Sequence, residues 1–170
     1  MGQADSCPMG GNIMMQAVIM AGGKGTRLAA LTKDEIPKPM VPVAGKPLLL
    51  WQGVERLKEN GITDIIMVIG HLGDKIKEYF GDGEKFGVAI RYYEETEPLG
   101  TAGSFYYLKD MIHGERFVMM SGDLFFDIDF QRMIRFHEEK GAVATLFVHP
   151  NGHPFDSDLL VLDKDDKITA

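Results

Sequence analysis

The chain has 170 residues, of which 45% are hydrophobic and 25% are charged, a composition typical of one globular domain large enough to bury a core. Its net charge of −7 at pH 7 excludes a nucleic-acid partner bound through a generally basic surface, so a phosphate site would have to be a local cationic pocket. The single cysteine excludes an internal disulfide, and no segment has the about 20 apolar residues of a membrane span, so we expect a cytoplasmic protein with no membrane partner.

The first 14 residues are rich in Gly, Pro, Ser and Asn and lack the basic start and apolar middle of a signal peptide. We expect residues 1–14 to be a disordered leader or a tag. The domain itself is expected to occupy residues 15–170.

Ala17–Met20 is an apolar run that predicts a buried strand, and a glycine-dense turn follows it at residues 21–27. Glycine has no Cβ, so such a turn brings bare backbone N–H groups close to a ligand. Arg27 ends the turn, and Lys38 stands between two prolines. Two cations beside these N–H groups favour a polyanionic ligand, and a nucleoside triphosphate is the commonest small one.

The glycine turn fits neither of two common phosphate-binding patterns. The phosphate loop of NTPases needs Ser or Thr directly after its lysine, but Lys24 is followed by Gly25. The dinucleotide fingerprint G-x-G-x-x-G would start at Gly23 and require glycine where Leu28 stands. A flexible glycine turn without a ligand is the remaining structural alternative.

Strand and helix signals alternate along the rest of the chain. Continuous apolar runs predict buried strands at residues 65–69, 88–93, 117–120, 144–149 and 159–163. Apolar residues at helical spacing predict helices within residues 47–60, 74–80, 103–111 and 130–140. This alternation predicts an α/β protein with a Rossmann-like, three-layer α/β/α fold and a mainly parallel central sheet.

Three loops rich in glycine or acidic residues follow predicted strands, at residues 21–27, 94–103 and 122–127. The carboxyl ends of parallel strands meet at one edge of a sheet, and ligands gather there. We therefore expect these three loops to form one site.

The sequence G-G-x-G-T-R at residues 22–27, followed by P-K-P-M at residues 37–40, closely resembles the signature of sugar-1-phosphate nucleotidylyltransferases. The resemblance runs from about Met15 to the end of the chain. It implies an α/β nucleotide-binding fold that joins an NTP to a sugar-1-phosphate and releases pyrophosphate. The residues that it implies for nucleotide binding are Ala21, Gly22, Gly23, Gly25, Thr26, Arg27, Glu95, Gly100 and Thr101.

Three residues receive catalytic roles. Asp123 follows a buried run, where a carboxylate is costly unless it binds donors or a metal, and the resemblance implies that it holds Mg²⁺. Arg27 would hold the departing phosphates, because its planar fork suits phosphate oxygens. Lys38 would neutralise charge around the α-phosphate and the incoming sugar phosphate. For Asp123 the structural alternative is a cap of the following turn.

Glu95 lies where relatives place the polar residue that contacts the base edge. An ionised carboxylate offers acceptors and no donor, and guanine presents adjacent N1–H and N2–H₂ donors, whereas uracil and thymine present only one. This favours GTP as the nucleotide. The alternative is that Glu94, Glu95 and Glu97 form a solvated acidic rim.

The chain departs from the family pattern near its end. Family members continue into an E-K-P segment, whose lysine holds the sugar phosphate, and supply a second aspartate for the metal. We therefore expect this chain to be the N-terminal portion of a longer protein. Residues 149–158 resemble heptose- or mannose-type guanylyltransferases, and Asp158 is assigned to sugar-phosphate binding.

Two alternatives to the enzyme come from other classes. One is a nucleotide-binding regulatory or assembly domain without turnover. The other is a dinucleotide-dependent oxidoreductase, which is disfavoured because His71, not an acidic residue, follows the second strand. Homo-oligomerisation and a downstream domain are left open as further partners.

Overall fold

The computed structural model describes residues 15–23, 25, 32–33, 35–97, 99–150, 152, 155 and 158–169, without the side chains of residues 101 and 102. The chain divides into two compact units, Met1–Phe130 and Gln131–Ala170, and each is described by itself.

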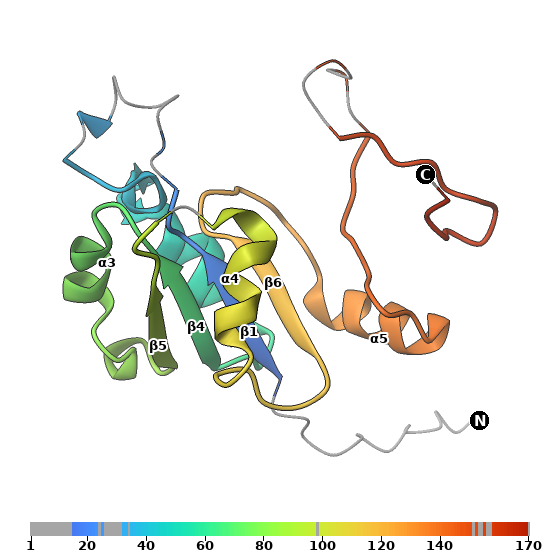
Figure 1. The fold of residues 1–170 in the computed structure, drawn as a ribbon, viewed down its shortest axis with the longest axis horizontal. Helices are drawn as coiled ribbons and strands as arrows, with labels where there is room; N and C mark the ends of the chain where they lie inside the picture. Colours follow the sequence, from blue (N-terminus) through green and yellow to red (C-terminus); the bar gives the residue numbers. More distant parts are fainter. Residues whose placement is uncertain are drawn as a thin grey trace, which may run out of the picture. The chain divides into compact units, whose positions relative to one another are not determined.

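A four-stranded sheet with the order β5-β4-β1-β6 forms the centre of the first unit, and all of its pairings are parallel (Figure 1). Its strands are β1 (Gln16–Met20), β4 (Asp64–Ile69), β5 (Ala89–Glu94) and β6 (Phe117–Ser121). The chain first moves outward from β1 to β5 and then returns across the sheet to β6. The ends of β1 and β6 therefore flank a topological switch point, where open α/β sheets bind ligands.

One face of the sheet is covered by η3 (Leu49–Glu55), a π-helix that continues into α2 (Arg56–Glu59), and by α3 (Gly73–Phe80). A Cβ built on Gly53 would lie 3.3 Å from Cδ1 of Ile19, and one built on Gly73 would lie 3.0 Å from Cδ1 of Ile69. Both helices thus pack directly on strand residues of the same face.

The other face is covered by α4 (Gly100–Leu108). Leu108 joins a buried cluster with Val18, Ile66 and Val68, which alternate along their strands with the residues that face the first helical layer. All of these side chains are fully buried. Helices on both faces of a parallel sheet confirm the predicted three-layer α/β/α fold.

Short elements lie between β1 and η3. They are η2 (Lys38–Met40), β2 (Pro42–Val43) and β3 (Lys46–Pro47), and a further short helix, η4 (Glu84–Phe86), precedes β5. Ala44 and Gly45 both have positive φ, which matches the type I′ turn that closes a tight hairpin.

The last helix, α5 (Phe130–Lys140), ends at Gly141 as predicted. The strands predicted at residues 144–149 and 159–163 are wrong, because these segments are extended but unpaired apart from the bridge between Leu162 and Ile168. Val148 and Leu159 are exposed there. An apolar run forms a strand only where a neighbouring strand offers hydrogen bonds, and the described part of the second unit offers only that single bridge.

Within the described residues, the helices are all too short or too polar to cross a membrane.

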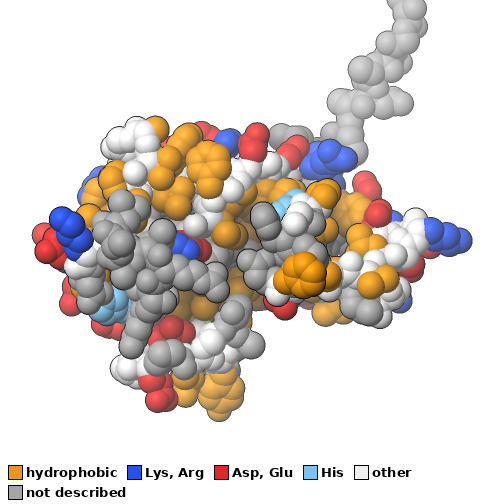
Figure 2. All heavy atoms as spheres, turned by 90° about the horizontal axis from the view of Figure 1, so that it is seen from above, with side chains coloured by type: hydrophobic (Ala, Val, Ile, Leu, Met, Phe, Trp, Pro, Cys, Tyr) orange, Lys and Arg blue, Asp and Glu red, His pale blue; other side chains and the backbone are white. Residues whose placement is uncertain are grey.

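Figure 2 looks onto the carboxyl ends of the strands, which run upward in Figure 1, and charged side chains of both signs lie there among hydrophobic ones. This face is not uniformly basic, in agreement with the net negative charge.

Candidate functional site

The loops after β1, β4 and β5 meet at Gly22. A Cβ built on Gly22 would lie 2.9 Å from Oε2 of Glu95 and 3.3 Å from the backbone N of Gly70. A Cβ on Gly70 would in turn lie 2.9 Å from the carbonyl oxygen of Gly22. Only glycine allows this close approach of two backbones, and it brings the Glu95 carboxylate beside the predicted phosphate loop.

Lys38 and Asp123 form an ion pair, although 85 positions separate them in sequence. Lys38 Nζ lies 2.5 Å from Oδ2 of Asp123, and the Ser121 hydroxyl donates to Oδ1 at 2.5 Å. Burial opposes ionisation of Asp123, but the hydrogen bonds from Lys38 and Ser121 and the charge of Lys38 outweigh it and lower the pKa of this carboxyl. The site therefore holds a carboxylate that stays charged at neutral pH.

The Lys38 side chain lies along the glycine loop. Gly25 has a φ of +61°, and a Cβ built on it would lie 3.0 Å from Cβ of Lys38. Pro37 and Pro39 on either side are both buried, so they fix the backbone from which Lys38 extends. The two prolines thus hold Lys38 with its stem beside the glycine loop and its ammonium group on Asp123.

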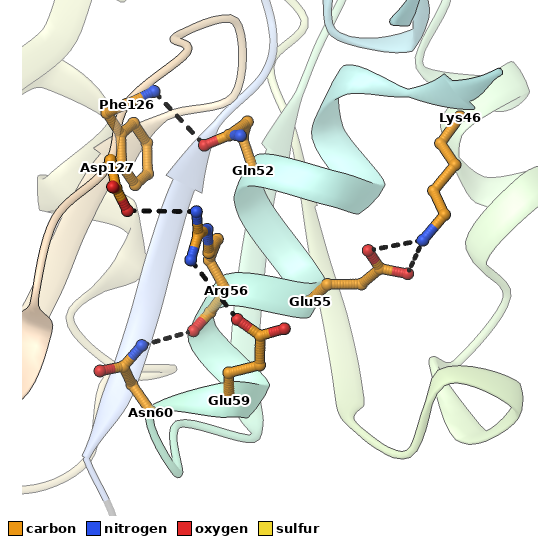
Figure 3. Close-up of polar contacts among 8 residues, drawn as sticks. All are labelled: Lys46, Gln52, Glu55, Arg56, Glu59, Asn60, Phe126 and Asp127. Carbon is orange, nitrogen blue, oxygen red and sulfur yellow. Dashed lines mark hydrogen bonds and ion pairs between the residues drawn. The ribbon is translucent and has the colours of Figure 1, made fainter. Parts of the chain in front are cut away.

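The loop that contains Asp123 is fastened to the helix behind it (Figure 3). The backbone N of Phe126 donates to Oε1 of the buried Gln52 at 3.3 Å, and Arg56 donates to Asp127 at 3.2 Å. Trp51 adds an edge-to-face contact with Phe125, with ring centroids 5.4 Å apart. The helix formed by η3 and α2 therefore positions the Asp123 loop.

The remaining predicted site residues differ in burial and in whether the structure describes them. Ala21 is buried and donates its backbone N–H to Val68, so this N–H is already used by the sheet. Gly23 and Gly100 are exposed. Thr26, Arg27 and the side chain of Thr101 lie outside the described residues. Asp158 is exposed and belongs to the second unit.

Several residues that hold the site together were missed from sequence. Ser104 is fully buried on α4 and its hydroxyl donates to Oε1 of Glu95. Ser121 and Gln52 support the Asp123 loop as described above. Ser121 stands two residues before Asp123, a spacing that could have indicated it, whereas nothing local connects Gln52 or Ser104 to the site.

Comparisons with known proteins agree on one family. A family model described as nucleotidyl transferase matches residues 16–169. The D-glycero-alpha-D-manno-heptose 1-phosphate guanylyltransferase of Campylobacter jejuni is 43% identical over 130 residues, which are 76% of this chain and 57% of that protein. A UTP–glucose-1-phosphate uridylyltransferase of a Synechocystis species is 36% identical over 143 residues, which are 78% of this chain and 36% of that protein.

A similar solved structure is that of HddC from Yersinia pseudotuberculosis complexed with GMP-PN. It superposes with a TM-score of 0.70 at 27% identity, over 92% of this chain and 68% of that one. The chain spans 57% of the length of the Campylobacter relative and 36% of the length of the Synechocystis relative. These relatives differ in the base they are named for, so the base has to be argued from the residues of this chain.

Proposed function

We propose, from the premise that this chain belongs to the nucleotidyl transferase family, that it provides the nucleotide site of a sugar-1-phosphate guanylyltransferase. Such an enzyme joins GTP to a sugar-1-phosphate and releases pyrophosphate. The observation that supports this most directly is the pair of Lys38 and Asp123, with Nζ and Oδ2 2.5 Å apart, beside the glycine loop at the switch point of the sheet. The manno-type sugar is proposed from the name of the Campylobacter relative.

The reaction needs alignment and charge neutralisation. A phosphate oxygen of the sugar-1-phosphate forms a bond to the α-phosphorus of GTP, and the bond from that phosphorus to the oxygen between the α- and β-phosphates breaks, so this oxygen leaves with pyrophosphate. Both reactants are anions, so cations around the α-phosphate lower the barrier. Lys38 would supply one positive charge, and Arg27 would hold the departing phosphates. Neither role requires a covalent intermediate on the chain.

Magnesium is proposed as the cofactor, with Asp123 as a ligand. The side chain of Asp123 is 26% exposed and the pKa of its carboxyl is lowered, so it offers one charged oxygen ligand at the switch point. This fits an ion that takes one or two carboxylates and completes its coordination with phosphate oxygens and water. When bound, Mg²⁺ would neutralise charge on the phosphates.

Glu95 supports guanine as the base. Its carboxylate lies against Gly22, so a base bound at the glycine loop would meet an acceptor-only group. Guanine offers two adjacent donors on one edge, and uracil offers one. The sugar-phosphate role of Asp158, a homo-oligomer, a downstream domain and a cytoplasmic location stay predictions.

Pyrophosphate release tests the proposal. It should be measured with GTP, ATP and UTP, each with mannose-1-phosphate, with a manno-heptose-1-phosphate and with glucose-1-phosphate, on this chain and on any longer chain that includes it. Release that is fastest with GTP and requires a manno-type sugar phosphate is expected. Nucleotide binding without release in every chain would instead support the regulatory or assembly domain, and release fastest with UTP would contradict the guanine assignment.

A further inference from the structure

The hydroxyl of Ser104 makes a stronger hydrogen bond to Glu95 than to the backbone of its own helix. Ser104 Oγ lies 3.3 Å from the carbonyl oxygen of Gly100, one turn earlier on α4, which is the usual acceptor for a serine inside a helix. Its contact with Oε1 of Glu95 is shorter, and a carboxylate is the better acceptor. A serine hydroxyl has one proton, so Glu95 receives it.

Glu95 is restrained from three sides. Its backbone N donates to the carbonyl oxygen of Ile69 at 2.8 Å, its Oε1 accepts from Ser104, and its Oε2 lies against Gly22. Ser104 is 0% exposed, so water cannot replace its hydroxyl from outside. The carboxylate is therefore held in one orientation before any ligand arrives.

The oxygen that faces the glycine loop remains available. Within the part of the chain that the structure describes, Oε2 of Glu95 receives no hydrogen bond, and Oε1 keeps acceptor capacity beyond the bond from Ser104. Two carboxylate oxygens at fixed positions match two adjacent N–H groups on one edge of a ring. A carboxylate that rotates freely loses more side-chain entropy when it accepts from two donors, so fixing it in advance favours a base with paired donors.

We propose that Ser104 is a positioning residue for base selection: it fixes the Glu95 carboxylate so that a base with paired donors, guanine, is preferred over bases with one. Ser104 itself does not touch the base. The inference rests on the proposed function, because it assumes that a nucleotide base lies at the glycine loop. It adds that selectivity depends on a buried hydroxyl of α4 as well as on Glu95.

Nucleotide affinities measured by calorimetry, without turnover, test this inference. We expect Ser104→Ala to lower the affinity for GTP about 10-fold, which is the loss typical of a hydrogen bond to a charged group. The affinities for ATP and UTP should change less than about 2-fold. Ser104→Thr keeps the hydroxyl and should retain the preference. If the added methyl group unfolds that variant, as a thermal melt would show, Ser104→Cys serves as the variant of similar volume and should fall between serine and alanine.

The matched control is Glu95→Gln, alone and combined with Ser104→Ala. If Ser104 acts through Glu95, the second change should add little once the carboxylate is gone. An equal loss for all three nucleotides, or full additivity of the two changes, would overturn the inference. Failure of the proposed function looks different: the unchanged chain would then show no preference for GTP at all.

Discussion

The two ends of the central sheet hold polar clusters of opposite kinds. At the amino ends of the strands, Gln16 is 2% exposed, donates to Oδ2 of Asp64 at 2.7 Å and accepts from the backbone N of His113. Asp64 also accepts from Arg91 at 3.0 Å. These groups satisfy one another, and they link β1, β4, β5 and the segment before β6.

At the carboxyl ends, the polar groups are only partly satisfied by one another. The side chains of Lys38 and Asp123 remain 33% and 26% exposed, and Oε2 of Glu95 has no donor among the described residues. Glycines occupy the positions where side chains would fill the space. A closed polar network stabilises a fold, whereas open acceptors and cations beside glycines can bind a ligand. The comparison predicts that changes at one end alter function and changes at the other alter stability.

The largest effect is expected for Asp123→Asn. Removal of this charge should lower pyrophosphate release about 1,000-fold, because Asp123 is the proposed metal ligand and the partner of Lys38. The free energy of unfolding should change by no more than about 1 kcal/mol, since the pair is partly exposed. Turnover assays and urea unfolding on the same sample check both. Unchanged turnover would contradict the role of Asp123.

A change at the amino ends of the strands should instead lower stability and leave nucleotide binding unchanged. Gln16→Ala removes a buried donor and acceptor and should lower the free energy of unfolding by about 2 kcal/mol, with GTP affinity unchanged. Urea unfolding and calorimetry measure the two quantities. Lys77→Gln is a matched control, because it breaks the exposed pair with Glu94 and should cost less than about 0.5 kcal/mol. A loss of GTP affinity in Gln16→Ala with little loss of stability would reverse the comparison.

Much of this fold follows from local sequence signals. The apolar runs of β1 and β4 predict buried strands, and the glycine after α3 marks the end of that helix. The two strands predicted after Gly141 fail because pairing depends on a neighbour that sequence alone does not show. The π-helical geometry of η3 was also not predictable, since Leu50, Val54 and Leu57 fit an ordinary helix equally well.

In the candidate site, too, some residues could be predicted from the sequence and some contacts could not. Gly22, Gly25, Lys38 and Asp123 were predicted from short motifs, because glycine, lysine and aspartate each leave a recognisable local pattern. The ion pair between Lys38 and Asp123 was not, since a tertiary contact over 85 positions has no local pattern. Ser104 likewise depends on how α4 packs against the end of β5.

A smaller effect should separate the metal role of Asp123 from its ion pair. Lys38 occupies Oδ2 of Asp123, so Mn²⁺ alone has to displace the ammonium group to bind there. Lys38→Met should therefore raise the affinity for Mn²⁺, measured by electron paramagnetic resonance without nucleotide, about 10-fold. Lys46→Met, which breaks the pair with Glu55 at 2.9 Å, is the control and should leave the affinity for Mn²⁺ unchanged. Equal Mn²⁺ affinity in both variants would argue against Asp123 as a metal ligand.

The smallest effect concerns acid stability. Burial works against the charge of Asp123, but the bonds from Lys38 and Ser121 lower the pKa of its carboxyl in the folded chain. A lowered carboxyl pKa adds stability above the unfolded value of about 4, and this stability is lost as the pH falls through the folded value.

The unfolding free energies of the unchanged chain and of Asp123→Asn should therefore differ by about 1 kcal/mol at pH 6 and converge toward pH 3. Urea unfolding across this range measures the difference. Asp110→Asn, which removes an exposed carboxylate outside the Asp123 loop, controls for the loss of one negative charge. A constant difference from pH 6 to pH 3 would show that the ion pair does not stabilise the fold, and the carboxyl end of the sheet would then contribute to binding alone.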